Sequence, residues 1–315
     1  RMLVDHIQSK INHPHIEAEE YPEYNRFEFV RRSTRAVGNI GGENVPVVVM
    51  NADGNYATVP DYLISNDEIL GQNGEKYPVF LSSQTDEIEK ANAEIVFVRI
   101  IYPALNQEII SLLKKKSNIV LILSTAHQNS VGEMRAFFHR LLIEDIKTPV
   151  ILAAKYHFNE LQELQIKAAA DLGVLFIDGF GDGILLENDS AEKNTVSVEQ
   201  VNSVAFGILQ ATRMRVTKTE FISCPSCGRT MFNLQTVIAR IKARTSHLKG
   251  LKIGIMGCVV NGPGEMADAD YGYVGAGRAR VSLYKKKECV QRNIPEDEAV
   301  DRLIELIKAH GDWHD

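Results

Sequence analysis

The sequence predicts an α/β fold, with a (β/α) barrel-like domain followed by a smaller α/β domain. Short apolar runs rich in β-branched residues recur at even spacing between about residues 36 and 217, and helical patterns alternate with them. Continuous apolar runs of this kind are typical of strands that are buried on both faces of a parallel sheet. No dinucleotide-binding fingerprint follows the first run, which favours a barrel over a doubly wound sheet.

Six strands and four helices are expected in the first domain. The strands are residues 47–49, 79–81, 95–98, 119–122, 150–152 and 174–177, and the helices are 86–93, 104–116, 131–143 and 158–172. In the last of these helices Leu161, Leu164, Ala168 and Leu172 recur at helical spacing, which indicates a face packed on a sheet. A further helix, from about 198 to 214, leads to a domain boundary near residue 218.

Residues 1–35 are polar and contain His6, His13 and His15. Three histidines are compatible with a metal site, but we expect a solvated connector from a missing upstream barrel. The chain does not begin with methionine, which indicates a fragment excised from a longer chain.

Two loops of the first domain contain residue types that occur in active sites. The loop Asp178-Gly-Phe-Gly-Asp-Gly183 follows an expected strand, and its glycines are compatible either with a phosphate site or with a tight turn. His127 closes Ser124-Thr-Ala-His127 after another expected strand, where a satisfied polar residue is the simpler interpretation. We therefore expect this domain to be a spacer without a cluster of basic residues, although a ligand site of its own remains an alternative.

The composition excludes several classes of protein. An apolar fraction of 44% and a charged fraction of 24% are those of a globular protein. A net charge of −6 argues against nucleic acid or an anionic membrane as partner. No apolar run approaches the ~20 residues of a membrane span, and no signal peptide is visible. All four cysteines lie in the last third of the chain, which favours a cytoplasmic protein with a metal or redox role.

Three of the four cysteines fall in two short segments of the second domain, residues 218–315. Cys224-Pro-Ser-Cys227 precedes an expected helix at 230–245, and the N-terminus of a helix stabilises thiolates. An expected strand at 251–256 leads to Cys258, and the turn Asn261-Gly-Pro-Gly264 brings Glu265 back to the same end. We interpret this set of three thiols and one carboxylate as the ligands of a [4Fe–4S] cluster, which makes this an iron–sulfur domain.

Zinc is the competing interpretation. Cys289 would complete a four-cysteine structural site, in a zinc-stapled structural or binding module. Cys258 and Cys289 do not form a second Cys-x-x-Cys pair, however, and Cys289 lies in the charged stretch Lys285-Lys-Lys-Glu-Cys289. Further on, the basic segment Gly275-Ala-Gly-Arg-Ala-Arg280 is compatible with a phosphate contact or with a plain hairpin turn, and residues 296–309 indicate a closing amphipathic helix.

The motifs of the second domain resemble a known family. Glu220-Phe-Ile-Ser-Cys-Pro-Ser-Cys-Gly-Arg-Thr230, Gly257-Cys-Val-Val-Asn-Gly-Pro-Gly-Glu265 and Tyr271-Gly-Tyr-Val-Gly275 are similar to the C-terminal domain of 4-hydroxy-3-methylbut-2-enyl diphosphate synthase, an iron–sulfur enzyme of the methylerythritol phosphate route to isoprenoids. The close resemblance covers residues 173–315. Residues 26–172, with Arg32-Ser-Thr-Arg-Ala-Val-Gly-Asn-Ile-Gly41, resemble the extra middle domain of the family's longer members.

The resemblance implies a reaction, a cofactor and a set of site residues. The family reductively opens the ring of 2-C-methyl-D-erythritol 2,4-cyclodiphosphate with two electrons from flavodoxin or ferredoxin. Its cluster ligands match Cys224, Cys227, Cys258 and Glu265, and Asn261 falls in the motif beside the cluster, where it would contact substrate. A carboxylate exchanges more readily than a thiolate, so Glu265 would mark the reactive corner, where substrate oxygen replaces it. Since the family's substrate-binding barrel lies upstream, we expect this fragment alone to bind a cluster without turning over substrate.

Overall fold

The chain divides into two compact units, Arg1–Arg215 and Val216–Asp315, in a computed structural model. The structure describes residues 1–11, 16–25, 27–65, 68–189 and 196–314. His13 and His15 lie outside the described residues. Each unit has hydrophobic clusters of its own, so each is described separately below.

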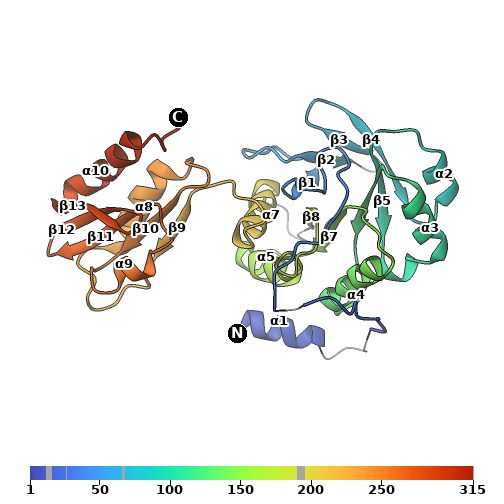
Figure 1. The fold of residues 1–315 in the computed structure, drawn as a ribbon, viewed down its shortest axis with the longest axis horizontal. Helices are drawn as coiled ribbons and strands as arrows, with labels where there is room; N and C mark the ends of the chain where they lie inside the picture. Colours follow the sequence, from blue (N-terminus) through green and yellow to red (C-terminus); the bar gives the residue numbers. More distant parts are fainter. Residues whose placement is uncertain (12–15, 26, 66–67, 190–195, 315) are drawn as a thin grey trace. The chain divides into compact units, whose positions relative to one another are not determined.

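The first unit is a closed barrel of eight strands in sequential order, in which β8 pairs with β1 (Figure 1). Neighbouring strands are parallel except around β3, which runs antiparallel to both β2 and β4. The strands are β1 (Val47–Asn51), β2 (Tyr62–Ser65), β3 (Glu68–Gly71), β4 (Lys76–Leu81), β5 (Val96–Ile100), β6 (Ile119–Leu123), β7 (Val150–Tyr156) and β8 (Gly183–Asn188).

Helices cover the outside of the barrel, and two separate cores result. The helices are α1 (Met2–Ile11), α2 (Thr85–Lys90), α3 (Gln107–Lys115), α4 (Ser130–Ile143), α5 (Leu161–Ala168), α6 (Val174–Ile177) and α7 (Val198–Ala211), with a 3-10 turn η1 (Tyr102–Ala104) and a π turn η2 (Ala169–Gly173). Because side chains alternate along a strand, Val96 and Val98 of β5 pack against the helices, whereas Phe97 fills the interior with Val49 and Ile122. The predicted barrel-like α/β architecture is confirmed.

Residues around Arg32 belong to the barrel rather than to a free connector. Arg32 is buried and donates from one nitrogen to the carbonyl oxygens of Ile146 (2.7 Å) and Thr148 (2.9 Å). Burial lowers the pKa of its guanidinium to about 10. Val37 and Ile40 form a β-bridge and pack inside the barrel. The polar composition of residues 1–35 concealed these buried contacts.

The chain start also differs from the expected solvated connector. Residues 2–11 form α1, which lies along α5. His6 Nε2 lies 2.8 Å from the carboxylate of Asp171, and Lys10 Nζ lies 3.1 Å from it. His6 therefore takes part in a polar contact of the fold, and its metal interpretation gains no support from this arrangement.

The predicted strand at residues 174–177 is wrong. These residues form α6, which continues α5 through η2, and the eighth strand is β8. The loop of residues 178–183 accordingly follows a helix, not a strand. Gly179 has a left-handed φ of 84°, and a Cβ there would collide with the carbonyl oxygen of Val30. The Asp182 carboxylate accepts from the Val150 N–H (3.0 Å) and the Thr34 hydroxyl (2.9 Å). The loop therefore closes the fold, and nothing in this geometry favours a phosphate site.

The second unit is a five-stranded sheet in the order β13-β12-β11-β10-β9. Its strands are β9 (Glu220–Ser223), β10 (Lys252–Met256), β11 (Tyr271–Gly277), β12 (Arg280–Lys285) and β13 (Glu288–Pro295), and its helices are α8 (Leu234–Thr245), α9 (Gly262–Glu265) and α10 (Glu296–Ala309). Strands β9, β10 and β11 are parallel, and β11, β12 and β13 are antiparallel. Apolar side chains of α8 and α10 share a core with the sheet. The predicted closing helix is confirmed. In the segment from Gly275 to Arg280, β11 continues to Gly277, and residues 278–279 form the hairpin turn to β12.

None of the described helices combines the length and the apolarity needed to cross a membrane.

Candidate functional site

The site is built at the carboxyl ends of two parallel strands. Cys224 follows β9, and Cys258 follows β10 after Gly257. The register pairs Ser223 with Ile255, so the two chain segments leave the sheet side by side. The Gly257 N–H donates to Sγ of Cys224 at 3.3 Å. The ends of parallel strands thus bring together two cysteines that are far apart in the sequence, as expected for α/β sheets.

All the predicted site residues of this unit line one cavity of about 220 Å³. A single buried water needs roughly 10–15 Å³, so the cavity has room for a group of many atoms. Cys258 is buried, Cys224 is half-buried, and Cys227 and Glu265 are exposed at the rim. The lining residues are Cys224, Pro225, Ser226, Cys227, Arg229, Thr230, Met256, Gly257, Cys258, Asn261, Gly262 and Glu265.

Arg229 is a site residue that the sequence reasoning missed. Two hydrogen bonds from Arg229 lower the pKa of the Cys227 thiol. The larger effect comes from the Arg229 backbone N–H, and the smaller one comes from its side chain. The hydrogen bond to Cys227, followed by the negative charges of Cys227 and Cys258, raises the pKa of Arg229 in turn. The expected source of thiolate stabilisation was a helix beginning at residue 230, but α8 begins at Leu234 and is capped by Asn233. The nearby arginine therefore takes the role assigned to the helix N-terminus.

Glu265 is positioned by the short helix α9. The carbonyl oxygen of Asn261 accepts from the N–H groups of Gly264 and Glu265, both at 3.0 Å. The next residue, Met266, is 1% exposed and packs beneath this turn with Ala269 and Val274. A Cβ at Gly254 of β10 would lie 2.6 Å from Cβ of Met266. Met266 is thus an anchor that seats α9 on the sheet and fixes the position of Glu265.

A close backbone approach holds the segment before Cys258. A Cβ at Gly275 of β11 would collide with the carbonyl oxygen of Gly257, and a Cβ at Gly257 would lie 2.8 Å from the Thr230 hydroxyl. Thr230 also accepts at 3.2 Å from the N–H of Cys227. These glycines allow β11, the Cys227 loop and the Cys258 loop to pack without intervening side chains.

The four predicted ligands share a cavity but do not form a binding group for one ion. Among the residues that the structure describes, no three His, Cys, Asp or Glu side chains are arranged to hold a metal ion. Cys289, the fourth ligand of the zinc interpretation, lies on β13 opposite Tyr284 and is not among the residues of the cavity. It is half-buried, and its neighbours Tyr284 and Met266 belong to a hydrophobic cluster.

Comparisons with known proteins bear on both units. Residues 220–309 match the GcpE protein C-terminal domain. The chain is 48% identical over 336 residues to 4-hydroxy-3-methylbut-2-en-1-yl diphosphate synthase (flavodoxin) of Bacteroides fragilis strain ATCC 25285, an alignment that covers 100% of this chain and 53% of that protein. The protein of the same name from Porphyromonas gingivalis is 44% identical over 99% of this chain and 52% of its own length. That of Chlorobaculum tepidum is 58% identical over 53% of this chain and 22% of its own length.

The chain is a relative of these synthases. The resemblance inferred from the cysteine and glycine motifs is confirmed, and it extends through the barrel as well as the second unit. The chain spans about half the length of the curated relatives that it matches over its whole length.

Proposed function

We propose that this chain is the cluster-bearing part of a 4-hydroxy-3-methylbut-2-enyl diphosphate synthase. One observation carries the proposal. Cys224 and Cys227 come from one chain segment, Cys258 and Glu265 come from another, and all four line one cavity at the carboxyl ends of β9 and β10.

The donor set fits a [4Fe–4S] cluster. Thiolates are the ordinary protein ligands of such clusters, and each ligand binds a different iron atom. A single zinc ion instead needs four ligands at about 2.0–2.3 Å from one point, and Cys289, the fourth cysteine of the zinc interpretation, is not among the residues that line the cavity. Backbone N–H groups near the sulfurs, such as that of Gly257, are a known means of tuning a cluster's reduction potential. When bound, the cluster would supply electrons and a Lewis-acidic iron to the reaction.

The protein residues around the cavity would have distinct roles. Cys224, Cys227 and Cys258 would anchor the group through sulfur. Glu265 would hold the fourth position through oxygen, which exchanges more readily, and its exposure at the rim leaves that position accessible. Asn261, also exposed and lining the cavity, would present its amide to the substrate. The Arg229 guanidinium would balance part of the negative charge of the thiolates.

The substrate of the whole protein would be 2-C-methyl-D-erythritol 2,4-cyclodiphosphate. The reaction would open its ring and remove a hydroxyl group with two electrons from flavodoxin or ferredoxin, and it would take place in the cytoplasm. The names of the relatives mention flavodoxin. An upstream barrel of the same chain would hold the substrate and cover the cavity. Val259 (48%) and Val260 (64%), which follow Cys258 in the chain, are exposed apolar residues that such a barrel could cover. The chain described here would then bind the cluster but remain inactive by itself, with its barrel as a spacer.

Anaerobic reconstitution with ferrous iron and sulfide tests the cluster assignment. We expect a broad visible absorption band, an EPR signal after reduction, and about four iron atoms per chain, as a [4Fe–4S] cluster requires. Serine in place of Cys224, Cys227 or Cys258 should reduce the iron content, whereas the matched control Cys289→Ser should not. Binding of one zinc ion with no iron uptake would instead support the structural-module alternative.

The variant Glu265→Cys distinguishes the assembly of the cluster from the turnover of substrate. In the full-length enzyme this variant should still assemble a cluster, because thiolate is a good iron ligand, but it should lose most of its activity. Full activity of Glu265→Cys would contradict the role given to the carboxylate.

A further inference from the structure

The barrel of the first unit ends in a polar layer at the carboxyl ends of its strands. Below that layer the interior is apolar, with Phe97, Ile122 and Ala153 on three neighbouring strands. Arg99 follows Phe97 by two residues on β5, and Lys155 follows Ala153 by two residues on β7. Because side chains alternate along a strand, both are at interior positions. The carboxyl end of a barrel is where barrel enzymes place their ligand sites, because side chains of many strands converge there.

A cavity of about 320 Å³ lies in this mouth of the barrel. Its apolar lining includes Met134, Ala153 and Leu172. Its polar lining comes from strands β5, β7 and β8, from the loop after β6, and from α1, α4 and η2. The volume is at the lower end of the roughly 300–1,000 Å³ that is typical of small-molecule sites. A small polar molecule would therefore fill it.

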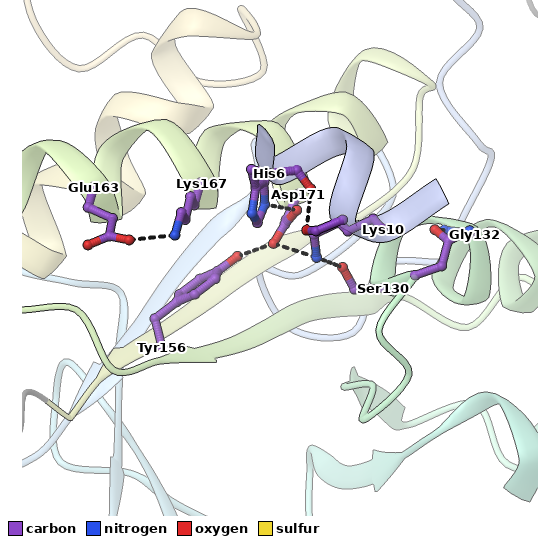
Figure 2. Close-up of polar contacts among 10 residues, drawn as sticks. His6, Lys10, Ser130, Gly132, Tyr156, Glu163, Lys167 and Asp171 are labelled. Atoms are coloured by element: carbon purple, nitrogen blue, oxygen red, sulfur yellow. Dashed lines mark hydrogen bonds and ion pairs between the residues drawn. The ribbon is translucent and has the colours of Figure 1, made fainter. Parts of the chain in front are cut away.

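Most charged groups around this cavity already have partners. Figure 2 shows Lys10 reaching from α1 to Asp171 and to the hydroxyl of Ser130 (2.7 Å). The Tyr156 hydroxyl donates to the same Asp171 oxygen that Lys10 contacts (2.9 Å), and His6 lies 2.8 Å from the other oxygen. Lys155 forms an ion pair with Asp189 at 2.7 Å, which raises the pKa of that lysine. In each ion pair the charge of the lysine is balanced by that of the aspartate, and these contacts fix the side chains at the rim of the cavity.

Arg99 and Glu187 are different. Both are half-buried and line the cavity, and within the described part of the chain neither side chain forms a hydrogen bond or an ion pair. A half-buried guanidinium with five donors and no acceptor is costly to leave without a partner. Carboxylate and phosphate groups match its donor geometry in a bidentate manner. One cation and one carboxylate in the same cavity therefore present opposite charges to a ligand.

We propose that the barrel mouth binds a small zwitterion, with its oxyanion on Arg99 and its ammonium group facing Glu187. Such a ligand would supply a counter-charge to Arg99 and, in addition to the attraction between Lys155 and Glu187, to Glu187 as well. The proposal concerns the first unit alone and does not depend on the cluster proposed for the second.

Titration calorimetry with two probes tests this assignment on the whole chain. Phosphoethanolamine carries an oxyanion and an ammonium group, and inorganic phosphate carries only the oxyanion. We expect phosphoethanolamine to bind at least tenfold more tightly than phosphate. Arg99→Met should abolish the binding of both probes. Glu187→Gln should weaken phosphoethanolamine at least tenfold without weakening phosphate. Lys90→Met, which removes an exposed cation on α2 that does not line the cavity, is the matched control.

Backbone amide resonances of the unaltered protein provide a test that does not depend on whether the variants fold. Phosphoethanolamine should shift the backbone amide resonances of residues 124–128 and 153–156 and leave those of the second unit unchanged. The proposal is overturned if neither probe binds, if binding survives Arg99→Met, or if the shifts map outside the barrel mouth.

Discussion

The anchoring role of Met266 at the candidate site can be tested by measuring how much its replacement lowers the free energy of unfolding. Its side chain is 1% exposed and lies between the sheet and the turn that carries Glu265. Truncation of a buried methionine to alanine costs about 2–5 kcal/mol. We expect Met266→Ala to cost about 3 kcal/mol, in the middle of that range, because the surrounding cluster is small and lies near an exposed rim.

Trp313 is the single tryptophan of the sequence and lies in the second unit, so tryptophan fluorescence reports on this unit alone. Its fluorescence during urea or thermal unfolding therefore reports the free energy of unfolding of this unit. For a domain of this size, 1 kcal/mol corresponds to about 4–8 °C in Tm, so Met266→Ala should lower Tm by roughly 12–24 °C. Met266→Leu should cost less than about 1.5 kcal/mol, and Met231→Ala, at a side chain that is 44% exposed, within about 0.5 kcal/mol.

A double-mutant cycle with Gly272 sharpens the test. A Cβ at Gly272 of β11 would collide with the Sδ and Cε atoms of Met266, but it would approach the Cβ of Tyr284 only to 3.1 Å. Gly272→Ala should therefore cost about 1–3 kcal/mol by overpacking in the unaltered protein, and clearly less in the Met266→Ala background. Equal costs in the two backgrounds, or a Met266→Ala cost below about 0.5 kcal/mol, would refute this account of how α9 is seated.

Two further predictions concern the same unit. Gly275→Ala should cost at least about 1–3 kcal/mol and reduce iron uptake on reconstitution, because its Cβ would collide with the carbonyl oxygen of Gly257; Gly277→Ala, whose Cβ would have only Arg280 Cβ nearby at 3.9 Å, should change neither. The Asp312 carboxylate accepts from Lys285 (2.8 Å) and Tyr271 (2.7 Å), and these contacts lower its pKa. Its contribution to stability is therefore complete above the unfolded pKa of about 3.9 and is lost as the pH falls through the lower folded value. The difference in Tm between the unaltered protein and Asp312→Asn should shrink between about pH 7 and pH 3, and a constant difference would contradict the assignment.

The barrel was predictable where strands are apolar and strongly patterned. Runs such as residues 119–122 and 150–152 are strands because they are buried on both sides, by the helices and by the barrel interior. Residues 174–177 have the same β-branched and aromatic composition but continue α5, because Leu175 and Phe176 reach the core from a helix equally well. Composition of a four-residue run does not distinguish these cases. The hairpin of β2 and β3 was missed because each strand has only four residues, Tyr-Leu-Ile-Ser and Glu-Ile-Leu-Gly, which is too short for a strand period to be recognised in the sequence.

The candidate site was predictable as a set of residues but not as a local structure. Its ligand types and turn glycines are local in the sequence, whereas the anchoring by Met266 depends on a contact with glycines of neighbouring strands. The polar layer in the barrel mouth was missed for the same reason. We expected no cluster of basic residues there, yet Lys10, Arg99 and Lys155 line one cavity although they are widely separated along the chain.

The unequal exposure of the three site cysteines has a practical consequence for handling the protein. Cys227 is exposed, whereas Cys258 is buried. In the metal-free protein, oxygen and alkylating reagents should therefore reach Cys227 first and Cys258 last, since accessibility governs which thiol is modified. Damage during aerobic purification would begin at the outermost sulfur, and a mass shift on the peptide containing Cys227 would be its earliest sign.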